Sequence, residues 1–211
     1  MNNHLLDLFD DSSAVKKIKN RLPYLFQLAE LESSRAGKIG MEVGSAREKV
    51  ITAFLIYKYG EENVESDVPI TEPEIDVKLF DQPISIKTIS GKEPMGVKLI
   101  WTVDAEKAKY FMDNWHPRYD LLFVHVNWFA EGGLYFIPYE VQNAVFNRIG
   151  RHEYIELPKQ GTNPGGVEIS NKALREVINS EGTRSVKINW IKESIDYNPF
   201  KRWVDLWGEN C

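Results

Sequence analysis

A nearly uninterrupted apolar run in the middle of the chain constrains the fold most. Residues 119–128 read YDLLFVHVNW, which lacks the polar–apolar alternation of a half-exposed strand. Such a run is typical of a β-strand at the centre of a sheet that is covered on both faces. The segment GLYFIP at 133–138 follows after a short connection and predicts an antiparallel hairpin partner. The chain is therefore expected to build layers of helices on a central sheet.

Helical and strand patterns on either side complete this arrangement. The first 36 residues predict two helices, the second starting at Pro23, because proline suits a first helical turn. A strong helix is expected at 45–58, where Ser45 and Glu48 have the spacing of a capping box. Segments with helical patterns come later at 104–115, 139–149 and 171–180. Short strands are expected at 63–69, 73–80, 83–89 and 186–191. This order predicts an α/β fold with a mixed central β-sheet flanked by helices.

Composition narrows the class of protein. With 211 residues, of which 43% are hydrophobic, the chain is expected to form a single domain, 1–211. Cys211 is its only cysteine, so no internal disulfide can form. No apolar run approaches the roughly 18 residues of a membrane span, and the N-terminus lacks a signal peptide's basic region. We expect a cytoplasmic protein without a membrane partner. Its late tryptophans predict an anchored C-terminus.

One hairpin carries an acid and a base where apolar side chains are the rule. Within residues 73–89, Asp81 and Gln82 are expected to form a tight turn. Strand alternation then lets Asp76 and Lys87, eleven positions apart, share one face of the sheet. A carboxylate there can bind Mg²⁺, which polarises a phosphate and acidifies bound water. The lysine can orient that water or stabilise phosphate charge. Alone, the pair could equally be a surface ion pair worth under about 1 kcal/mol.

The order of elements around the hairpin resembles the PD-(D/E)xK nucleases, the family typical of type II restriction endonucleases. Its hallmark is a helix, a strand pair carrying Asp and then acid-x-Lys, a further helix and more strands. The matching parts are helix 45–58, Asp76, residues 85–87 (SIK) and helix 104–115. The overall pattern is also similar to that of the ThaI-type restriction endonucleases, which are of similar size.

This resemblance implies a restriction-endonuclease-like fold and a DNA endonuclease that uses Mg²⁺ to cut double-stranded DNA at a short specific sequence. It also implies a homodimer in the cytoplasm of a prokaryote. Within the single domain, a helical N-terminal region at 1–40 precedes a catalytic core at 41–140 and a C-terminal region at 141–211. The net charge of −5 counts against a simple basic DNA-binding protein, although affinity depends on where the basic residues lie.

Two positions depart from the family pattern. Ser85 stands where an acid is usual, and Ile75 stands where the proline of the motif would be. The second metal-binding carboxylate must then come from a neighbouring helix, and the resemblance favours Glu48. Other candidates remain open: Glu42, Asp104 and Glu106. The resemblance also implies that the main-chain carbonyl of Ile86 binds the metal, while Ser85 either joins the site or is only a small strand residue.

Two glycine-rich segments are candidates for DNA contacts. They are residues 34–47 (SRAGKIGMEVGSAR) and 157–170 (LPKQGTNPGGVEIS), the second of which is expected to be an extended loop. Side chains in them that can donate to bases or phosphates are Arg35, Lys38, Arg47, Lys159, Gln160, Thr162 and Asn163. Met41 could wedge between base steps. Both segments can equally be solvated turns, with Ser170 capping the next helix.

Other chemistries find less support in the sequence. The four histidines lack zinc-ligand spacing, and no GxxxxGK[ST] phosphate loop is present. Three alternatives to a restriction enzyme remain. They are a repair-type or structure-specific nuclease of the same fold, a non-catalytic DNA-binding protein with a degenerate site, and a small protein-interaction module. The recognition sequence, the cleavage position and the stagger do not follow from the sequence.

Overall fold

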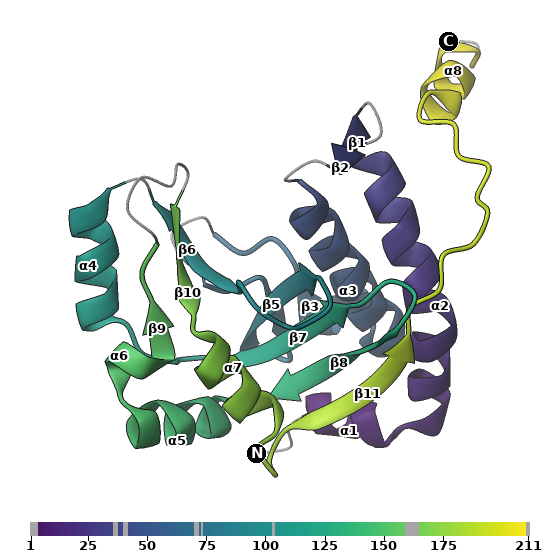
Figure 1. Cartoon of the computed structure of the whole chain (residues 1–211). Helices are drawn as coiled ribbons and strands as arrows, with labels where there is room; N and C mark the ends of the chain where they lie inside the picture. Colours follow the sequence, from purple (N-terminus) through teal and green to yellow (C-terminus); the bar gives the residue numbers. More distant parts are fainter. Residues whose placement is uncertain are drawn as a thin grey trace.

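A mixed six-stranded sheet runs through the middle of the molecule (Figure 1). The computed structural model describes residues 4–35, 38–39, 42–69, 72, 74–102, 104–158 and 165–209. In sheet order the strands are β11 (Arg184–Asn189), β8 (Glu131–Ile137), β7 (Asp120–Val126), β5 (Gln82–Ser90), β4 (Val77–Leu79) and β3 (Val64–Glu65). β5 and β7 are parallel, and the other neighbours are antiparallel. The predicted fold class is confirmed, with the apolar run forming the inner strand β7.

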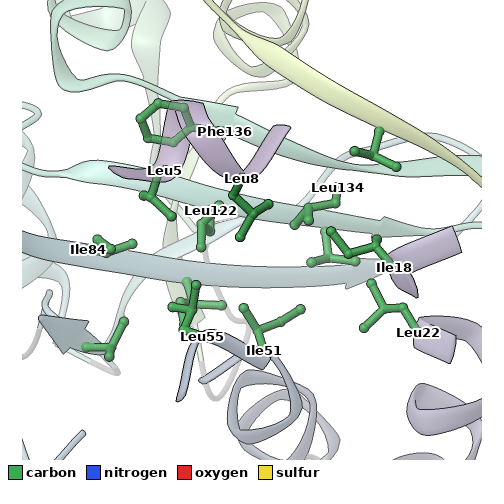
Figure 2. Close-up of a cluster of buried hydrophobic side chains, with 14 of the residues drawn as sticks. Leu5, Leu8, Ile18, Leu22, Ile51, Leu55, Ile84, Leu122, Leu134 and Phe136 are labelled. Atoms are coloured by element: carbon green, nitrogen blue, oxygen red, sulfur yellow. The ribbon is translucent and has the colours of Figure 1, made fainter. Parts of the chain in front are cut away.

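Three N-terminal helices cover one face of this sheet: α1 (His4–Asp10), α2 (Ser12–Glu32) and α3 (Val43–Tyr59). Their apolar side chains meet those of β5, β7 and β8 in one core cluster, which Figure 2 shows from close by. The predicted helix break at Pro23 is wrong, because Pro23 lies inside α2. Burial of Ile18, Leu22 and Phe26 along one side of α2 outweighs the hydrogen bond that a proline removes.

A second, smaller sheet and four helices lie over the other face. The sheet has the order β6 (Lys98–Thr102), β10 (Gly165–Ile169) and β9 (Ile155–Glu156). The helices are α4 (Ala105–Asn114), α5 (Tyr139–Ile149), α6 (Arg151–Tyr154) and α7 (Asn171–Ile178). Asp104 and Ser170 cap α4 and α7 as expected. Strand β10 was expected to be loop, because its glycines are typical of turns. They instead allow close approach of Pro158 and Lys98.

Short elements and a separate helix complete the chain. The pair β1 (Ser34–Arg35) and β2 (Lys38–Ile39) precedes α3, and a 3₁₀ turn, η1 (Glu61–Asn63), precedes β3. Helix α8 (Lys201–Trp207) stands apart from the rest of the molecule at the end of an extended segment (Figure 1). It buries none of its residues, so the expected anchoring of the C-terminus is wrong within one chain. No helix in the described part of the chain is long and apolar enough to span a membrane.

The turn between β4 and β5 sets the register of the hairpin. Phe80 and Asp81 occupy it with φ values of 48° and 62°, and Leu79 pairs with Gln82. Positive φ at both central residues is the geometry of a type I′ turn, which matches the twist of the strands. The predicted turn at Asp81-Gln82 was therefore one residue too late. The observed register sets Val77 opposite Ile84 and places Asp76 beside the segment 85–87.

Candidate active site

The carboxylate of Asp76 lies where β4 begins and β5 continues alone. Strand β4 pairs with β5 only as far as Ile84, and the N–H of Asp76 donates to the Ile84 carbonyl at 3.0 Å. Beyond that point Asp76 Oδ2 takes the place of a strand partner, accepting from the N–H of Ile86 at 2.6 Å. The N–H and C=O of one strand residue point to the same side. The Ile86 carbonyl therefore faces the same edge as the Asp76 carboxylate.

Two side chains of β5 also reach this carboxylate. Lys87 Nζ lies 3.1 Å from Asp76 Oδ2, and Ser85 Oγ donates to the same oxygen at 3.2 Å. The strand alternation therefore predicted correctly that Asp76 and Lys87 share a face. Their side chains remain 22% and 23% exposed, respectively. The pair is thus packed well enough to be held in place and open enough to meet a ligand.

A second acid approaches the pair from α3. The pKa of Glu48 is raised, first by burial and then by the negative charge of Asp76, while Lys87 acts in the opposite direction. These effects place the Glu48 carboxylate within electrostatic reach of both groups. The predicted capping box is wrong, because α3 begins at Val43 and Ser45 lies within its first turn. Glu48 is thereby free of a capping role.

The other acids considered from the sequence lie elsewhere. Asp104 uses its Oδ1 to cap α4, accepting from the N–H groups of Glu106 at 2.9 Å and Lys107 at 3.2 Å. Glu106 and Glu42 are exposed. The charges that act on Glu48 are those of Asp76 and Lys87. Of the four candidates, Glu48 is thus the acid that the structure brings to the pair.

The donor set around Asp76 fits a hard divalent cation. In the described residues no three or more His, Cys, Asp or Glu side chains gather as a metal cluster, so the protein offers two carboxylates here. The outward-facing carbonyl of Ile86 adds a third oxygen. Mg²⁺ is commonly held by one or two carboxylates, with water and substrate oxygens completing its shell. The mutual repulsion that raises the pKa of Glu48 is also what a cation would relieve.

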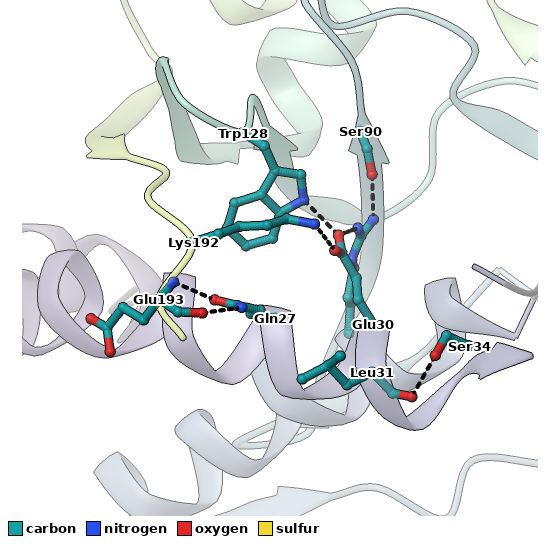
Figure 3. A network of polar contacts seen from close by, with 9 residues as sticks. Gln27, Glu30, Leu31, Ser34, Ser90, Trp128, Lys192 and Glu193 are labelled. Carbon is teal, nitrogen blue, oxygen red and sulfur yellow. Dashed lines mark hydrogen bonds and ion pairs between the residues drawn. The ribbon is translucent and has the colours of Figure 1, made fainter. Parts of the chain in front are cut away.

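Arg47, the neighbour of Glu48 on α3, points into the protein instead. Its side chain forms an ion pair with Glu30 of α2 and donates to Ser90 Oγ at 2.7 Å (Figure 3). Glu30 also accepts from Trp128 Nε1 at 2.6 Å and from Lys192 Nζ at 2.9 Å. Arg47 is only 2% exposed, so the prediction that it contacts DNA is wrong.

The physical reason lies in Glu30, whose buried carboxylate requires a paired cation. The sequence held a signal for this cluster. Glu30 continues the four-residue spacing of Ile18, Leu22 and Phe26, so it falls on the buried side of α2. Helix periodicity alone could have marked Glu30 as a buried acid. It could not have named Arg47 as the partner, because the pairing depends on how α2 and α3 pack.

The remaining predicted DNA contacts are not placed by the structure. The backbones of Arg35 and Lys38 pair with each other between β1 and β2, but their side chains lie outside what is described. The same holds for the whole residues Met41, Lys159, Gln160, Thr162 and Asn163. These seven residues stay predictions.

The mixed sheet, its flanking helices and the acid–lysine site at the free edge of β5 define a DNA endonuclease of the type II restriction class. A family profile described as "Restriction endonuclease ThaI" matches residues 8–209. The chain belongs to the ThaI restriction endonuclease family. It is 65% identical to a solved structure described as "Restriction endonuclease in complex with substrate DNA", with a TM-score of 0.93. That match covers 99% of this chain and 100% of the other. No curated protein matches the chain.

Proposed function

We propose that this restriction endonuclease hydrolyses phosphodiester bonds of double-stranded DNA at a short specific sequence, with Mg²⁺, Asp76, Glu48 and Lys87 at its reaction centre. The observation that carries the proposal is the 3.1 Å contact between Asp76 and Lys87 beside a second acid with a raised pKa. Perturbed acids beside a cation in a partly open position are typical of catalytic sites. The related structure that holds substrate DNA supports DNA as the ligand.

Each residue has a distinct part in this proposal. Asp76 and Glu48 would hold the cation, together with the carbonyl of Ile86. When bound, Mg²⁺ supplies Lewis acidity to the phosphate and lowers the pKa of a coordinated water. The ammonium of Lys87 positions that water and stabilises negative charge on the phosphate. Ser85 orients Asp76 through its 3.2 Å hydrogen bond and needs no acidic function of its own.

DNA binding and assembly extend the proposal. We assign sequence reading to Arg35, Lys38, Met41, Lys159, Gln160, Thr162 and Asn163, in the segments 34–47 and 157–170. Arg47 is left out, because its guanidinium is held by Glu30 inside the protein. A homodimer is the natural assembly for cutting both strands of a two-fold symmetric site. We also propose that the enzyme acts in the cytoplasm of a prokaryotic cell.

Plasmid digestion tests the reaction centre. We expect cleavage with Mg²⁺ and none with EDTA, and loss of cleavage in Asp76→Ala and Lys87→Ala. Lys78→Ala is the matched control, because Lys78 lies on the same hairpin but pairs with Glu65 at 3.1 Å, away from the site. Control and wild type should give the same fragments of fixed length. Ragged or branch-dependent products would indicate a repair-type nuclease, and DNA binding without metal-stimulated cleavage would indicate a degenerate site. Full activity of both site variants would contradict the assignment.

A further inference from the structure

Helix α8 carries an apolar stripe that nothing in its own chain covers. Phe200, Trp203, Val204 and Trp207 have the spacing i, i+3, i+4 and i+7, which places them along one side of a helix. They are 69%, 58%, 65% and 90% exposed, respectively. This is the anchor pattern of a helix that packs into an apolar groove of a partner. An isolated seven-residue helix is also marginal in water, so such a contact would be expected to stabilise it.

The composition of α8 argues against DNA as that partner. Lys201 and Arg202 are offset by Asp205 and Glu209, so the segment 201–209 has no net charge. Lys201 is moreover paired with Asp205 at 2.7 Å. Affinity for a phosphate backbone requires uncompensated basic residues. An apolar, uncharged stripe fits a protein surface instead.

The segment before α8 leads the helix away from its own body. Its start is fixed to α2, where Gln27 and the main chain of Glu193 exchange two hydrogen bonds of 2.7 and 2.8 Å (Figure 3). Lys192 pairs with Glu30 at the same place. Further along, the carboxylate of Glu32 contributes to a raised pKa of Tyr197, after the effect of burial. The segment thus follows α2 toward its C-terminal end, and α8 stands beyond that end (Figure 1).

An apolar groove of about 290 Å³ lies between α2 and α3, nearer the beginning of α2. Its floor includes Leu8, Ile18, Leu22, Ile51 and Leu55, several of which Figure 2 labels. Its rim includes the exposed side chains of Ala53 and Tyr57 on α3. Grooves of this kind receive the aromatic anchors that dominate protein interfaces. The same chain thus holds an unoccupied donor stripe and a matching acceptor, directed away from each other.

We infer that α8 is an exchanged dimerisation arm, whose aromatic stripe packs into the α2–α3 groove of a second copy of this chain. The inference deepens the proposed function, because it rests on a two-fold dimer being the cleaving species. The exposed parts of Phe200, Trp203 and Trp207 amount to roughly 400–500 Å². Two exchanged arms and the two surfaces that receive them would then bury about 1,800 Å², within the range of a stable interface. Exchange between two-fold related copies also closes the assembly at a dimer.

Self-association of the full-length chain tests the donor side. We expect wild type to sediment as a dimer and Trp203→Ser/Trp207→Ser to associate about 100-fold more weakly or worse, since buried tryptophans dominate interfaces. The matched control is Lys201→Ala/Asp205→Ala, which changes the charged side of the same helix and should remain dimeric. Thermal unfolding and circular dichroism should confirm that all three chains fold. A tryptophan variant that dimerises like wild type would overturn the inference.

A mixing experiment tests the acceptor and the exchange itself. Ala53→Glu places a charge at the groove rim and should also weaken the dimer. Each defective chain alone lacks both arm–groove contacts, but a mixture of Ala53→Glu with Trp203→Ser/Trp207→Ser restores one. Heterodimers should therefore appear on mixing, which an arm packed on its own chain could not produce. Absence of heterodimers, or binding of α8 to DNA or lipid vesicles in place of the second copy, would refute the exchange. Cleavage assayed separately with Asp76→Ala, which should still dimerise, keeps this outcome distinct from failure of the reaction centre.

Discussion

Two acid–base clusters begin at neighbouring residues of α3 and have opposite charge balances. At Arg47, the carboxylate of Glu30 is 4% exposed and is surrounded by two cations, Arg47 and Lys192. At Glu48, two carboxylates share one cation, Lys87, and the pair formed by Asp76 and Lys87 is more than a fifth exposed. The first cluster has a surplus of positive charge and holds elements together. The second lacks one positive charge and is open to receive it.

The hydrogen bonds show the same contrast. Both oxygens of Glu30 accept, Oε1 from Arg47 and Trp128 and Oε2 from Lys192. In the described part of the chain, the side-chain contacts of Asp76 all go to Oδ2. A carboxylate with one committed oxygen can still bind a metal through the other. Saturation therefore distinguishes a structural acid from a candidate catalytic one, although both form ion pairs with a base.

The largest expected effect breaks the open cluster. Asp76→Ala should reduce the rate of DNA cleavage at saturating Mg²⁺ by about 1,000-fold or more, because it removes a metal ligand whose loss water cannot replace. Single-turnover cleavage of a plasmid measures this, and binding of a labelled duplex in Ca²⁺ shows whether the protein still engages DNA. A decrease under tenfold would mean that the metal is held elsewhere.

Breaking the closed cluster should change stability before it changes chemistry. Glu30→Ala leaves the Arg47 guanidinium buried without its anion, which costs about 3–5 kcal/mol in the free energy of unfolding. Glu30→Met combined with Arg47→Leu removes both charges and should recover most of this loss, since apolar pairs can replace buried ion pairs. Urea denaturation measures both. The comparison fails if the double variant is no more stable than Glu30→Ala.

Lys87 provides a smaller test within the open cluster. Lys87→Ala should lower the cleavage rate by about 100-fold, because it removes one donor to developing charge and leaves the metal ligands in place. Lys87→Arg keeps the charge but presents a planar fork of donors, so it should restore only part of the activity. If Lys87→Arg were as active as wild type, the lysine would act through charge alone and would not position the water.

The sequence predicted the open cluster better than the closed one for a physical reason. The contact between Asp76 and Lys87 follows from strand alternation within one hairpin, and even the one-residue error in the turn left both side chains on the same face. The pairing of Glu30 with Arg47 requires two helices to pack in one specific way, which periodicity does not determine. Strand β10 was missed for a related reason. Its two glycines favour loops locally, and pairing with β6 overrides that preference.

The smallest expected effect has opposite signs in the two clusters. Burial and the charge of Asp76 raise the pKa of Glu48, so in metal-free protein the folded state binds a proton there more tightly than the unfolded state. Stability should therefore fall as the pH rises from the ordinary glutamate value through the raised pKa of Glu48. Glu48→Gln should remove this loss and stabilise the metal-free protein at neutral pH by under about 1 kcal/mol. Removing the Glu30 carboxylate, in contrast, destabilises the fold.

Thermal unfolding in EDTA across this pH range measures the effect, with Glu42→Gln as the control for an exposed acid at the start of the same helix. Added Mg²⁺ or Ca²⁺ should then raise the unfolding temperature of wild type and have a smaller effect on Glu48→Gln, because a ligand stabilises only the state that binds it. If Glu48→Gln were less stable than wild type in EDTA, the Glu48 carboxylate would already be neutralised by protein groups. The two clusters would then be alike, and the open one would have no charge deficit for a cation to fill.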